Sequence, residues 1–268
     1  DLYLANQKLS RIATMSGVDV TAGIVGAEGA AKYAIVGGDC QVLNVKLEPS
    51  ESVRCEPGML MHMHPKVTPV TSFACSCGRA CAGESQWSSE FINKTKDPLV
   101  VGLTPNTPAK VVPVDLSTIT AGGAKALRFQ QGAWMASIGK VSLSYSSQCN
   151  PCRCCCSGQG AISSSVKGDG TVFLEGHGTV MTKILGAGEK MVVDQDSVLA
   201  WADTVDLNFR MAGGCCAICC GGEGMFNTVL DGGNKGGLVI LQSMPFQKFR
   251  QAILNPTTRQ GGGKTNNV

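Results

Sequence analysis

Residues 211–226 read Met-Ala-Gly-Gly-Cys-Cys-Ala-Ile-Cys-Cys-Gly-Gly-Glu-Gly-Met-Phe, and this stretch decides the expected fold. It joins an alternating apolar strand to a Gly-Glu-Gly turn through four cysteines. Similar stretches occur at residues 73–85 and 148–160, where cysteines again precede a Gly-Glx-small turn. A supersecondary unit that recurs along a chain indicates a repeat architecture. We therefore expect one domain made of three similar modules.

The composition agrees with a globular chain that has many tight turns. Its 268 residues are enough for a hydrophobic core without disulfides, and 34 of them are Gly. The formal charge of +3 is small and no Lys/Arg stripe stands out, so we expect no nucleic-acid partner. The sequence lacks an apolar run of the roughly 18 residues that span a bilayer, and it lacks a signal-peptide pattern. We expect a cytoplasmic or mitochondrial protein.

Alternating strands and turns begin near residue 33. Leu43, Val45 and Leu47 alternate with polar residues before a Pro-Ser-Glu-Ser turn, which predicts a β-hairpin. The same hairpin pattern recurs at residues 185–190 and, more loosely, at residues 119–123. These patterns predict short antiparallel strands in each of the three modules.

Two further stretches, residues 141–145 and 205–211, alternate strictly between apolar and polar side chains. Each is typical of a strand with one buried and one wet face. No persuasive helical stripe with caps lies between residues 33 and 245. Apolar residues with helical spacing at 246–254 predict one C-terminal helix, which Pro256 ends.

The chain is predicted to have three parts. Residues 1–32 form an N-terminal appendage, residues 33–254 a three-repeat β domain, and residues 255–268 a flexible, Gly/Asn-rich tail. Short strands in three modules are consistent with a sandwich or a double-stranded β-helix. We therefore predict an all-β fold with a short C-terminal helix.

Five segments, in order along the chain, resemble a known family: residues 38–45, 51–61, 82–85, 221–226 and 241–246. They are similar to the altered-inheritance-of-mitochondria family, whose members are also described as tryptophan-RNA-binding-attenuator-like proteins. The resemblance implies three structural repeats around a pseudo-three-fold axis, with a subunit shape like the attenuator protein and double-stranded β-helices. It implies no catalytic residues. A shared fold does not carry RNA or tryptophan binding to this chain.

The cysteines depart from the family pattern, in which Gly, Leu and Phe are usual in these hairpins. Twelve of the 14 cysteines lie there: Cys75, Cys77, Cys81, Cys149, Cys152, Cys154, Cys155, Cys156, Cys215, Cys216, Cys219 and Cys220. A pseudo-three-fold arrangement would gather them at one end of the molecule. Four interpretations stay open, namely packing as small hydrophobic residues, disulfides, metal ligation and S-acylation.

The metal interpretation rests on two Cys-x-x-Cys pairs. They are Cys149 with Cys152 and Cys216 with Cys219, and this spacing suits thiolate ligands for zinc or a softer metal. The pairs lie in different modules, and the doubled cysteines are not a standard zinc frame. These four cysteines are therefore candidate metal ligands, and the other interpretations stay open for them.

The turns that follow the cysteines are predicted to be structural: Gly83, Glu84, Gly158, Gln159, Gly222 and Glu223. Gln159 stands where the other two turns have glutamate, so a set of acid/base carboxylates would be incomplete. We expect these Glx side chains to accept backbone N–H bonds within their turns.

Other polar residues give weaker patterns. His62 and His64 alternate on one predicted strand, where a metal pair is one interpretation and solvent exposure the preferred one. His177, between two glycines, is expected to be a turn residue. Residues 93–95 form the one N-glycosylation sequon, which matters only for a secreted protein.

No Ser/His/Asp arrangement, phosphate loop or dinucleotide fingerprint occurs in a suitable context. We therefore predict a non-enzymatic structural or scaffold protein without a cofactor, which self-associates into homo-oligomers. One alternative is a peripheral membrane-organising protein that docks on a membrane surface through its cysteine-rich hairpins. The other is a metal- or small-ligand-binding module.

Overall fold

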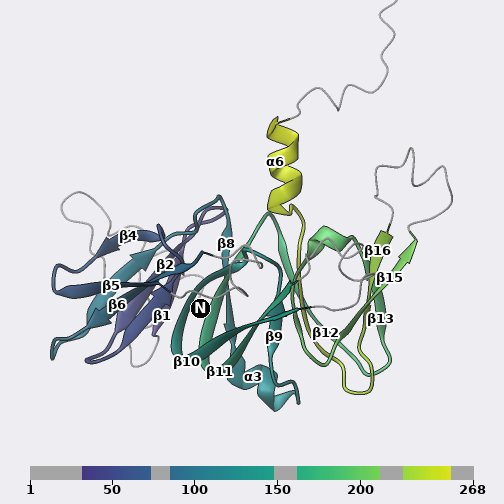
Figure 1. The fold of residues 1–268 in the computed structure, drawn as a ribbon, viewed down its shortest axis with the longest axis horizontal. Coiled ribbons are helices and arrows are strands. Elements are labelled where there is room, and N and C mark those ends of the chain that lie inside the picture. The colour runs from purple at the N-terminus through teal and green to yellow at the C-terminus, as the bar shows by residue number, and fades with distance from the viewer. Residues whose placement is uncertain (1–31, 74–84, 148–161, 212–225, 255–268) are drawn as a thin grey trace, which may run out of the picture.

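The computed structural model describes residues 32–73, 85–147, 162–211 and 226–254. Strands dominate these residues (Figure 1), and the helical elements among them are α3 (Leu116–Ala121), the 3-10 turn η1 (Gln195–Ser197) and α6 (Phe246–Leu254). The predicted all-β class with a short C-terminal helix is confirmed, and α6 has the predicted bounds. Almost all of the predicted appendage, the tail, the twelve clustered cysteines and the six turn residues lie outside the described residues.

The described strands run in chain order as β1 (Tyr33–Val36), β2 (Val42–Leu47), β3 (Ser52–Cys55), β4 (Leu60–Met63), β5 (Val67–Phe73), β6 (Trp87–Asn93), β7 (Leu99–Leu103), β8 (Lys110–Asp115), β9 (Leu127–Phe129), β10 (Trp134–Ser147), β11 (Ile162–Gly176), β12 (Val180–Leu185), β13 (Lys190–Val193), β14 (Val198–Ala202), β15 (Asp206–Met211), β16 (Phe226–Asp231) and β17 (Gly237–Gln242).

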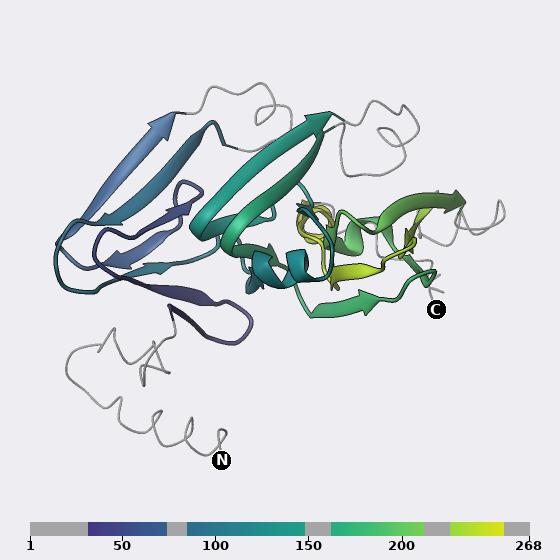
Figure 2. The ribbon, with the colours of Figure 1, turned by 90° about the horizontal axis from the view of Figure 1, so that it is seen from below.

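The strands form three antiparallel sheets. One has the order β1-β2-β7-β4, a second β13-β16-β15, and the largest β12-β17-β14-β9-β11-β10-β3-β6-β5, with β8 paired to β11. The long strands β10 and β11 run side by side through the middle of the molecule (Figure 2). The N-terminal strands lie at one end in Figure 1, and β12, β13, β15 and β16 lie at the other.

The same set of pairings recurs along the chain. First, β2 and β4 flank β7, while β3 and β5 flank β6. Later, β12 and β14 flank β17, while β13 and β15 flank β16. Between these groups, β8 and the start of β10 flank the end of β11, while β9 and the end of β10 flank its start. The three predicted repeats and their pseudo-three-fold axis stay predictions.

Two of the predicted hairpins have the wrong strand partners. β2 and β3 belong to different sheets, and so do β12 and β13, so each connecting turn carries the chain from one sheet to another. Both turns contain the same type of hydrogen bond, in which a glutamate carboxylate accepts from a backbone N–H. The Glu51 carboxylate accepts from the backbone N–H of Glu48 at 3.0 Å, and the Glu189 carboxylate accepts from that of Gly186 at 2.9 Å. Alternation identified these strands but not their neighbours.

The third, looser hairpin prediction is wrong, because residues 116–121 form helix α3. Its first turn is capped by Asp115, whose carboxylate accepts from the backbone N–H of Ser117 at 2.9 Å. Leu116 and Ile119, three residues apart, point into the core with exposures of 3% and 6%. Burial of this one face stabilises a helix too short to persist alone.

The core consists of three clusters of buried side chains. Phe173 on β11 belongs to the first cluster, whereas its neighbours Val172 and Leu174 belong to the second. Because successive strand residues point to opposite faces, β11 links the two clusters. Each fully buried aliphatic or aromatic side chain contributes about 1.5–3 kcal/mol to folding.

The asparagine of the glycosylation sequon is buried. Asn93 has no exposed surface, and its amide donates to the carbonyl oxygens of Leu47 and Asp97, both at 2.8 Å. Its side-chain oxygen accepts from the backbone N–H of Thr95 at 2.9 Å. The side chain therefore links the end of β2 to the loop that follows β6, and it is inaccessible for glycosylation in the folded protein.

Candidate functional site

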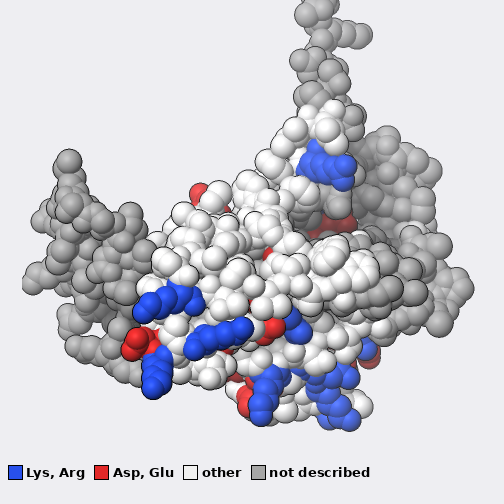
Figure 3. Space-filling model, turned by 60° about the vertical axis from the view of Figure 1, so that its left-hand side comes forward, with Lys and Arg blue, Asp and Glu red and all other residues white. Residues whose placement is uncertain are grey.

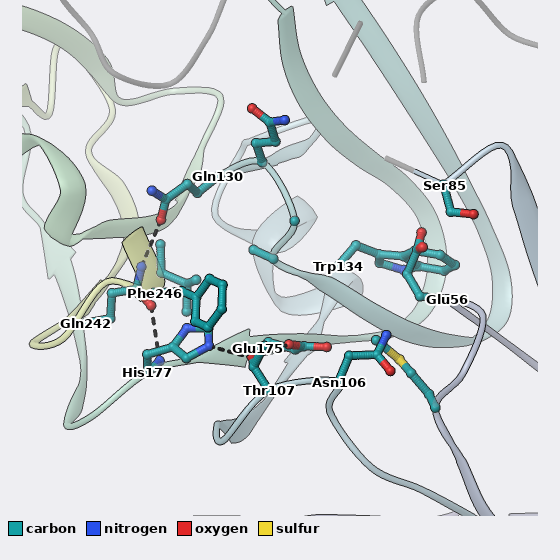
Figure 4. A pocket seen from close by; sticks show the side chains of 15 residues that line it. Glu56, Ser85, Asn106, Thr107, Gln130, Trp134, Glu175, His177, Gln242 and Phe246 are labelled. Carbon is teal, nitrogen blue, oxygen red and sulfur yellow. Dashed lines mark hydrogen bonds between the residues drawn. The ribbon is translucent and has the colours of Figure 1, made fainter. Parts of the chain in front are cut away.

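A cavity of about 390 Å³ lies where residues from all three groups of strands meet. Figure 4 shows its lining, with His177, Gln242 and Phe246 on one side and Glu56 and Trp134 on the other. The described residues that line it are Glu56, Met59, Ser85, Asn106, Thr107, Gln130, Gln131, Gly132, Ala133, Trp134, Glu175, His177, Leu199, Gln242 and Phe246. None of them is a lysine or an arginine.

Turns and strand ends position these side chains. The turn from Gln130 to Ala133 closes with a 3.1 Å backbone hydrogen bond, and Gly132 within it has a φ of +73° that favours glycine. The Ala133 carbonyl accepts from the N–H of Glu175 at 2.8 Å. The end of β11 is therefore held against the loop that opens β10, and both contribute side chains to the cavity.

Thr107 links a carboxylate to an imidazole. Its hydroxyl donates to Glu175 Oε2 at 3.3 Å and lies 2.8 Å from His177 Nε2 (Figure 4). The single hydroxyl proton serves one of these two contacts at a time, so the tautomer of His177 decides which atom donates in the 2.8 Å contact. Burial lowers the pKa of His177 below its usual value of 6.5, and the Gln242 side chain partly offsets this effect.

A second set of bonds continues from the same histidine. The Gln242 side chain accepts from the His177 backbone N–H at 3.1 Å and donates to Gln130 Oε1 at 2.8 Å. The His177 ring also lies 5.5 Å from the Phe246 ring. Together these contacts tie the end of β11, the end of β17 and the start of α6 to one wall of the cavity.

Sequence reasoning missed this site because its residues are far apart. His177 was predicted as a turn residue, and it does follow the last residue of β11, but its side chain lies in the cavity. Thr107 and Gln242 lie 70 and 65 positions from it. The one local signal is Glu175, a charged residue that continues the buried run Val172-Phe173-Leu174 and is itself only 4% exposed.

The predicted histidine pair is not brought together as a metal site. His62 Nε2 lies 3.0 Å from Asn44 Oδ1, so its side chain reaches across β7 to β2 of the same sheet rather than facing solvent alone. His64 is exposed and accepts from the backbone N–H of Lys66 at 3.2 Å. Within the described ranges, no group of three His, Cys, Asp or Glu side chains is placed to hold a metal ion.

The two cysteines that lie in the described part of the chain differ sharply. Cys40 is exposed, whereas Cys55 is fully buried in the first core cluster. Burial, with a smaller effect from the charge of Glu56, raises the pKa of the Cys55 thiol to about 12. Cys55 therefore acts as a small apolar side chain.

Helix α6 presents apolar side chains to solvent. Phe249, Ile253 and Leu254 are 37%, 59% and 64% exposed, and α6 stands away from the sheets in Figure 1. The base of the helix is attached by Phe246 in the cavity wall and by an ion pair between Lys248 and Asp194. No described helix has the length and apolar character needed to cross a bilayer.

Strand β12 is an edge strand of the largest sheet. Among the described strands it pairs only with β17. Met181 and Ile184 on it are 60% and 76% exposed. An edge strand of this kind offers unpaired backbone donors and acceptors beside exposed apolar side chains.

Two exposed aromatic residues lie where β5 ends and β6 begins. Phe73 and Trp87 are 55% and 50% exposed, and their ring centres are 4.8 Å apart. They are directly paired across the two strands. The contact shields one side of each ring and leaves the rest to solvent.

These features define a predominantly antiparallel β protein with a cavity at the junction of its strand groups and three exposed apolar features, on α6, on β12 and at the β5–β6 pair. The family model of mitochondrial biogenesis AIM24 matches residues 33–244, and the chain belongs to this family. The predicted family is thus confirmed.

Two proteins from Streptococcus pyogenes are similar to this chain. An uncharacterized protein of serotype M6 is 26% identical over 220 residues, which cover 78% of this chain and 83% of that protein. The crystal structure of a second S. pyogenes protein matches with a TM-score of 0.62 at 22% identity, covering 84% of this chain and 98% of that one. The structural match supports the fold.

Proposed function

We propose that this protein is a non-enzymatic structural or scaffold protein that self-associates into homo-oligomers through α6 and β12. The observation that carries the proposal is the uncovered apolar face of α6. Phe249 and Ile253 are four residues apart and therefore lie on one side of the helix. Exposed apolar side chains of this kind gain hydrophobic stabilisation when a second copy covers them.

The edge strand β12 supports the same proposal. Antiparallel pairing of β12 with β12 of a second copy would continue the largest sheet across a two-fold axis. The charge of Lys183 would oppose such pairing, but an ion pair at 2.5 Å joins Lys183 to Glu189. At the opposite edge of the sheet, Pro69 lies within β5 and lacks a backbone N–H, so β5 is the poorer partner.

The arrangement of polar groups in the cavity supports a non-enzymatic role. In a Ser-His-Asp arrangement, the carboxylate bonds to the imidazole and holds it ready to accept the hydroxyl proton. Here the carboxylate of Glu175 bonds to the hydroxyl of Thr107 instead. The contacts therefore run from carboxylate to hydroxyl to imidazole, whereas a triad requires the order carboxylate, imidazole, hydroxyl.

The distribution of charge supports the expectation of no nucleic-acid partner. On the face in Figure 3, Lys and Arg lie mainly near the lower edge together with Asp and Glu, and much of the remaining described surface is uncharged. Several lysines are in ion pairs, such as Lys32 with Glu51 and Lys46 with Glu48, both at 2.8 Å. Phosphate binding requires a more continuous basic surface.

Self-association is tested by sedimentation velocity across a wide range of micromolar concentrations. The wild-type chain is expected to sediment as an oligomer, and Phe249→Lys and Ile184→Lys are each expected to weaken association at least about tenfold, or about 1.4 kcal/mol. Val36→Lys is the matched control, because Val36 is 44% exposed on β1 and lies outside both contacts. A wild-type chain that is monomeric at every concentration overturns the proposal.

The finer architecture belongs to the same proposal. We propose three repeats related by a pseudo-three-fold axis, and the recurring pairings around β7, β11 and β17 support this arrangement. The four interpretations of the clustered cysteines stay predictions, since those residues lie outside the described part of the chain.

Docking on a membrane surface is the second candidate function. It is favoured by Phe73 and Trp87, because exposed aromatic side chains are enriched where proteins meet the membrane interface. Vesicle flotation is expected to recover the wild-type chain with phospholipid and to recover several-fold less of Trp87→Ser. Equal recovery of the two proteins, or no recovery of the wild type, contradicts this candidate.

A further inference from the structure

We propose that a second cavity, which lies on the largest sheet, binds a small organic acid through its carboxylate group. This cavity has a volume of about 400 Å³, and its lining comes from β3, β6 and β10. Among the described residues, it shares no lining residue with the cavity beside His177, and none of its lining lies on α6 or β12. The inference is therefore independent of the proposed self-association.

Strand register places four polar side chains of this second cavity together. Arg54 on β3 is directly paired with Ser137 on β10 and with Glu90 on β6. Directly paired residues point to the same face of a sheet, and so does Ser52, two positions before Arg54. Val53 points to the opposite face and belongs to the first core cluster. The four polar side chains therefore face away from that core and line the cavity.

The Arg54 guanidinium has donors that the protein does not use. Its Nη2 donates to the Val141 carbonyl at 2.9 Å, and this is the guanidinium's one hydrogen bond within the described ranges. Its Nε is buried and has no partner there. A guanidinium has five N–H donors, and a partly buried charge is costly when it lacks acceptors. The remaining donors on the Nη atoms are therefore available to an anion in the cavity.

The guanidinium is held in position before a ligand binds. The bond to Val141 fixes one edge, and the Trp134 ring supports the group, with its centre 5.9 Å from Arg54 Cζ. Trp134 is itself only 1% exposed and is packed in the second core cluster. A planar guanidinium matches the two oxygens of a carboxylate, and one that is already fixed loses little freedom on pairing. The geometry therefore favours a carboxylate as the bound group.

Ser137 gives a second, independent indication of a ligand. This residue lines the cavity and is only 4% exposed, yet its hydroxyl has no hydrogen-bond partner among the described residues. Buried hydroxyl groups are usually hydrogen-bonded, because their removal from water is costly. A carboxylate on Arg54 would lie beside the directly paired Ser137 and would accept from its hydroxyl. One ligand group would thus satisfy both donors.

The charge of the lining selects an anion with a single charge. Arg54 and Lys140 supply two positive charges, and Glu90 supplies one negative charge. Within the described part of the chain, neither cation forms an ion pair. The Glu90 carboxylate accepts from the Ser52 hydroxyl at 2.5 Å instead of pairing with Arg54 across the strands. One carboxylate would neutralise the cavity, whereas a phosphate dianion would leave a net negative charge beside Glu90.

The volume of the cavity suits a small molecule. About 400 Å³ lies within the range of roughly 300–1,000 Å³ that is usual for ligand pockets. Lys140 and Ser142 are exposed and form the open side of the cavity on β10. A short carboxylic acid therefore fits, with its carboxylate on Arg54 and the rest of the molecule toward this open side.

Calorimetric titration of the full chain with butyrate tests the inference. Butyramide is the matched neutral probe, because it has nearly the same shape and lacks the charge, and inorganic phosphate is the probe of higher charge. Butyrate is expected to bind saturably, and the other two probes at least about tenfold more weakly.

Variants of the lining test which groups hold the carboxylate. Arg54→Gln is expected to weaken butyrate binding at least about tenfold, and Lys140→Gln about threefold. Arg54→Lys keeps the charge but loses the planar fork, so its binding should be intermediate. Arg210→Gln removes an exposed arginine from β15, outside the cavity, and should bind butyrate like the wild type.

Thermal melts show whether each variant is folded before its titration is compared. If Arg54→Gln does not fold, Lys140→Gln at its exposed position provides the comparison. Three results overturn the inference: no binding of butyrate to the wild type, binding of butyramide or phosphate as tight as that of butyrate, or unchanged butyrate binding by the folded glutamine variants of the lining.

Discussion

Replacing Gly168 by alanine is expected to lower the free energy of unfolding by about 3 kcal/mol or more. Gly168 has a φ of +127°, which side chains other than glycine's rarely tolerate. A β-carbon there would lie 2.0 Å from the carbonyl oxygen of Lys140, far inside van der Waals contact. The backbone has little room to move, because β10 and β11 are paired on both sides of this position.

The effect is expected to be large because this glycine lies at a junction of the fold. β11 pairs with β9 at residues 164–166 and with β8 at residues 171–176, so the strand changes partners between these ranges. Gly139 and Gly170 lie in the same part of the β10–β11 pair and are paired with each other. Without glycine here, the two halves of β11 cannot keep both sets of partners.

Urea denaturation measures this loss, with Gly38→Ala as the control. A β-carbon on Gly38 would meet open space, and its φ lies outside the positive region, so the control should change stability by less than about 0.5 kcal/mol. Equal stability of the two variants would show that Gly168 is not needed for β11 to change partners at this point.

Replacing Phe173 by alanine is expected to cost about 3–5 kcal/mol. The side chain is fully buried, and its ring contacts Tyr33 edge-on with a centroid separation of 4.8 Å. Truncation removes this contact and leaves a cavity beside the first core cluster, which neighbouring strands can fill only in part. The loss should extend to β1, since Tyr33 begins that strand.

The matched control is Phe73→Ala, since Phe73 is 55% exposed and loses mainly its contact with Trp87. That contact is worth about 0.5–1.5 kcal/mol. Both losses are measured from the midpoints and slopes of urea unfolding curves. A loss for Phe173→Ala no larger than the control's would contradict the central place of β11 in the core.

Local patterns predicted the class of fold because they depend on neighbours in the sequence. Alternation identified β2 and β15, and helical spacing gave the bounds of α6. Strand partners depend on the path of the whole chain, so the turns at residues 49–52 and 185–190 have the pattern of hairpins although they join different sheets. Helix α3 was missed because a cap and two buried residues are too short a pattern to detect.

The cavity could not be predicted for a related reason. Thr107, Glu175 and Gln242 come from separate strand groups and meet only when the groups pack together. None carries a sequence motif, and His177 between two glycines is typical of a turn. The clustered cysteines, which dominate the sequence, lie outside the described residues, so their predicted roles stay predictions.

A native mass spectrum of the full wild-type chain at micromolar concentration tests self-association most directly. The uncovered face of α6 and the open edge of β12 predict ions at an integer multiple of the chain mass. Phe249→Lys combined with Ile184→Lys should shift the spectrum to the mass of one chain. A wild-type spectrum that contains only the single chain would contradict the proposed function.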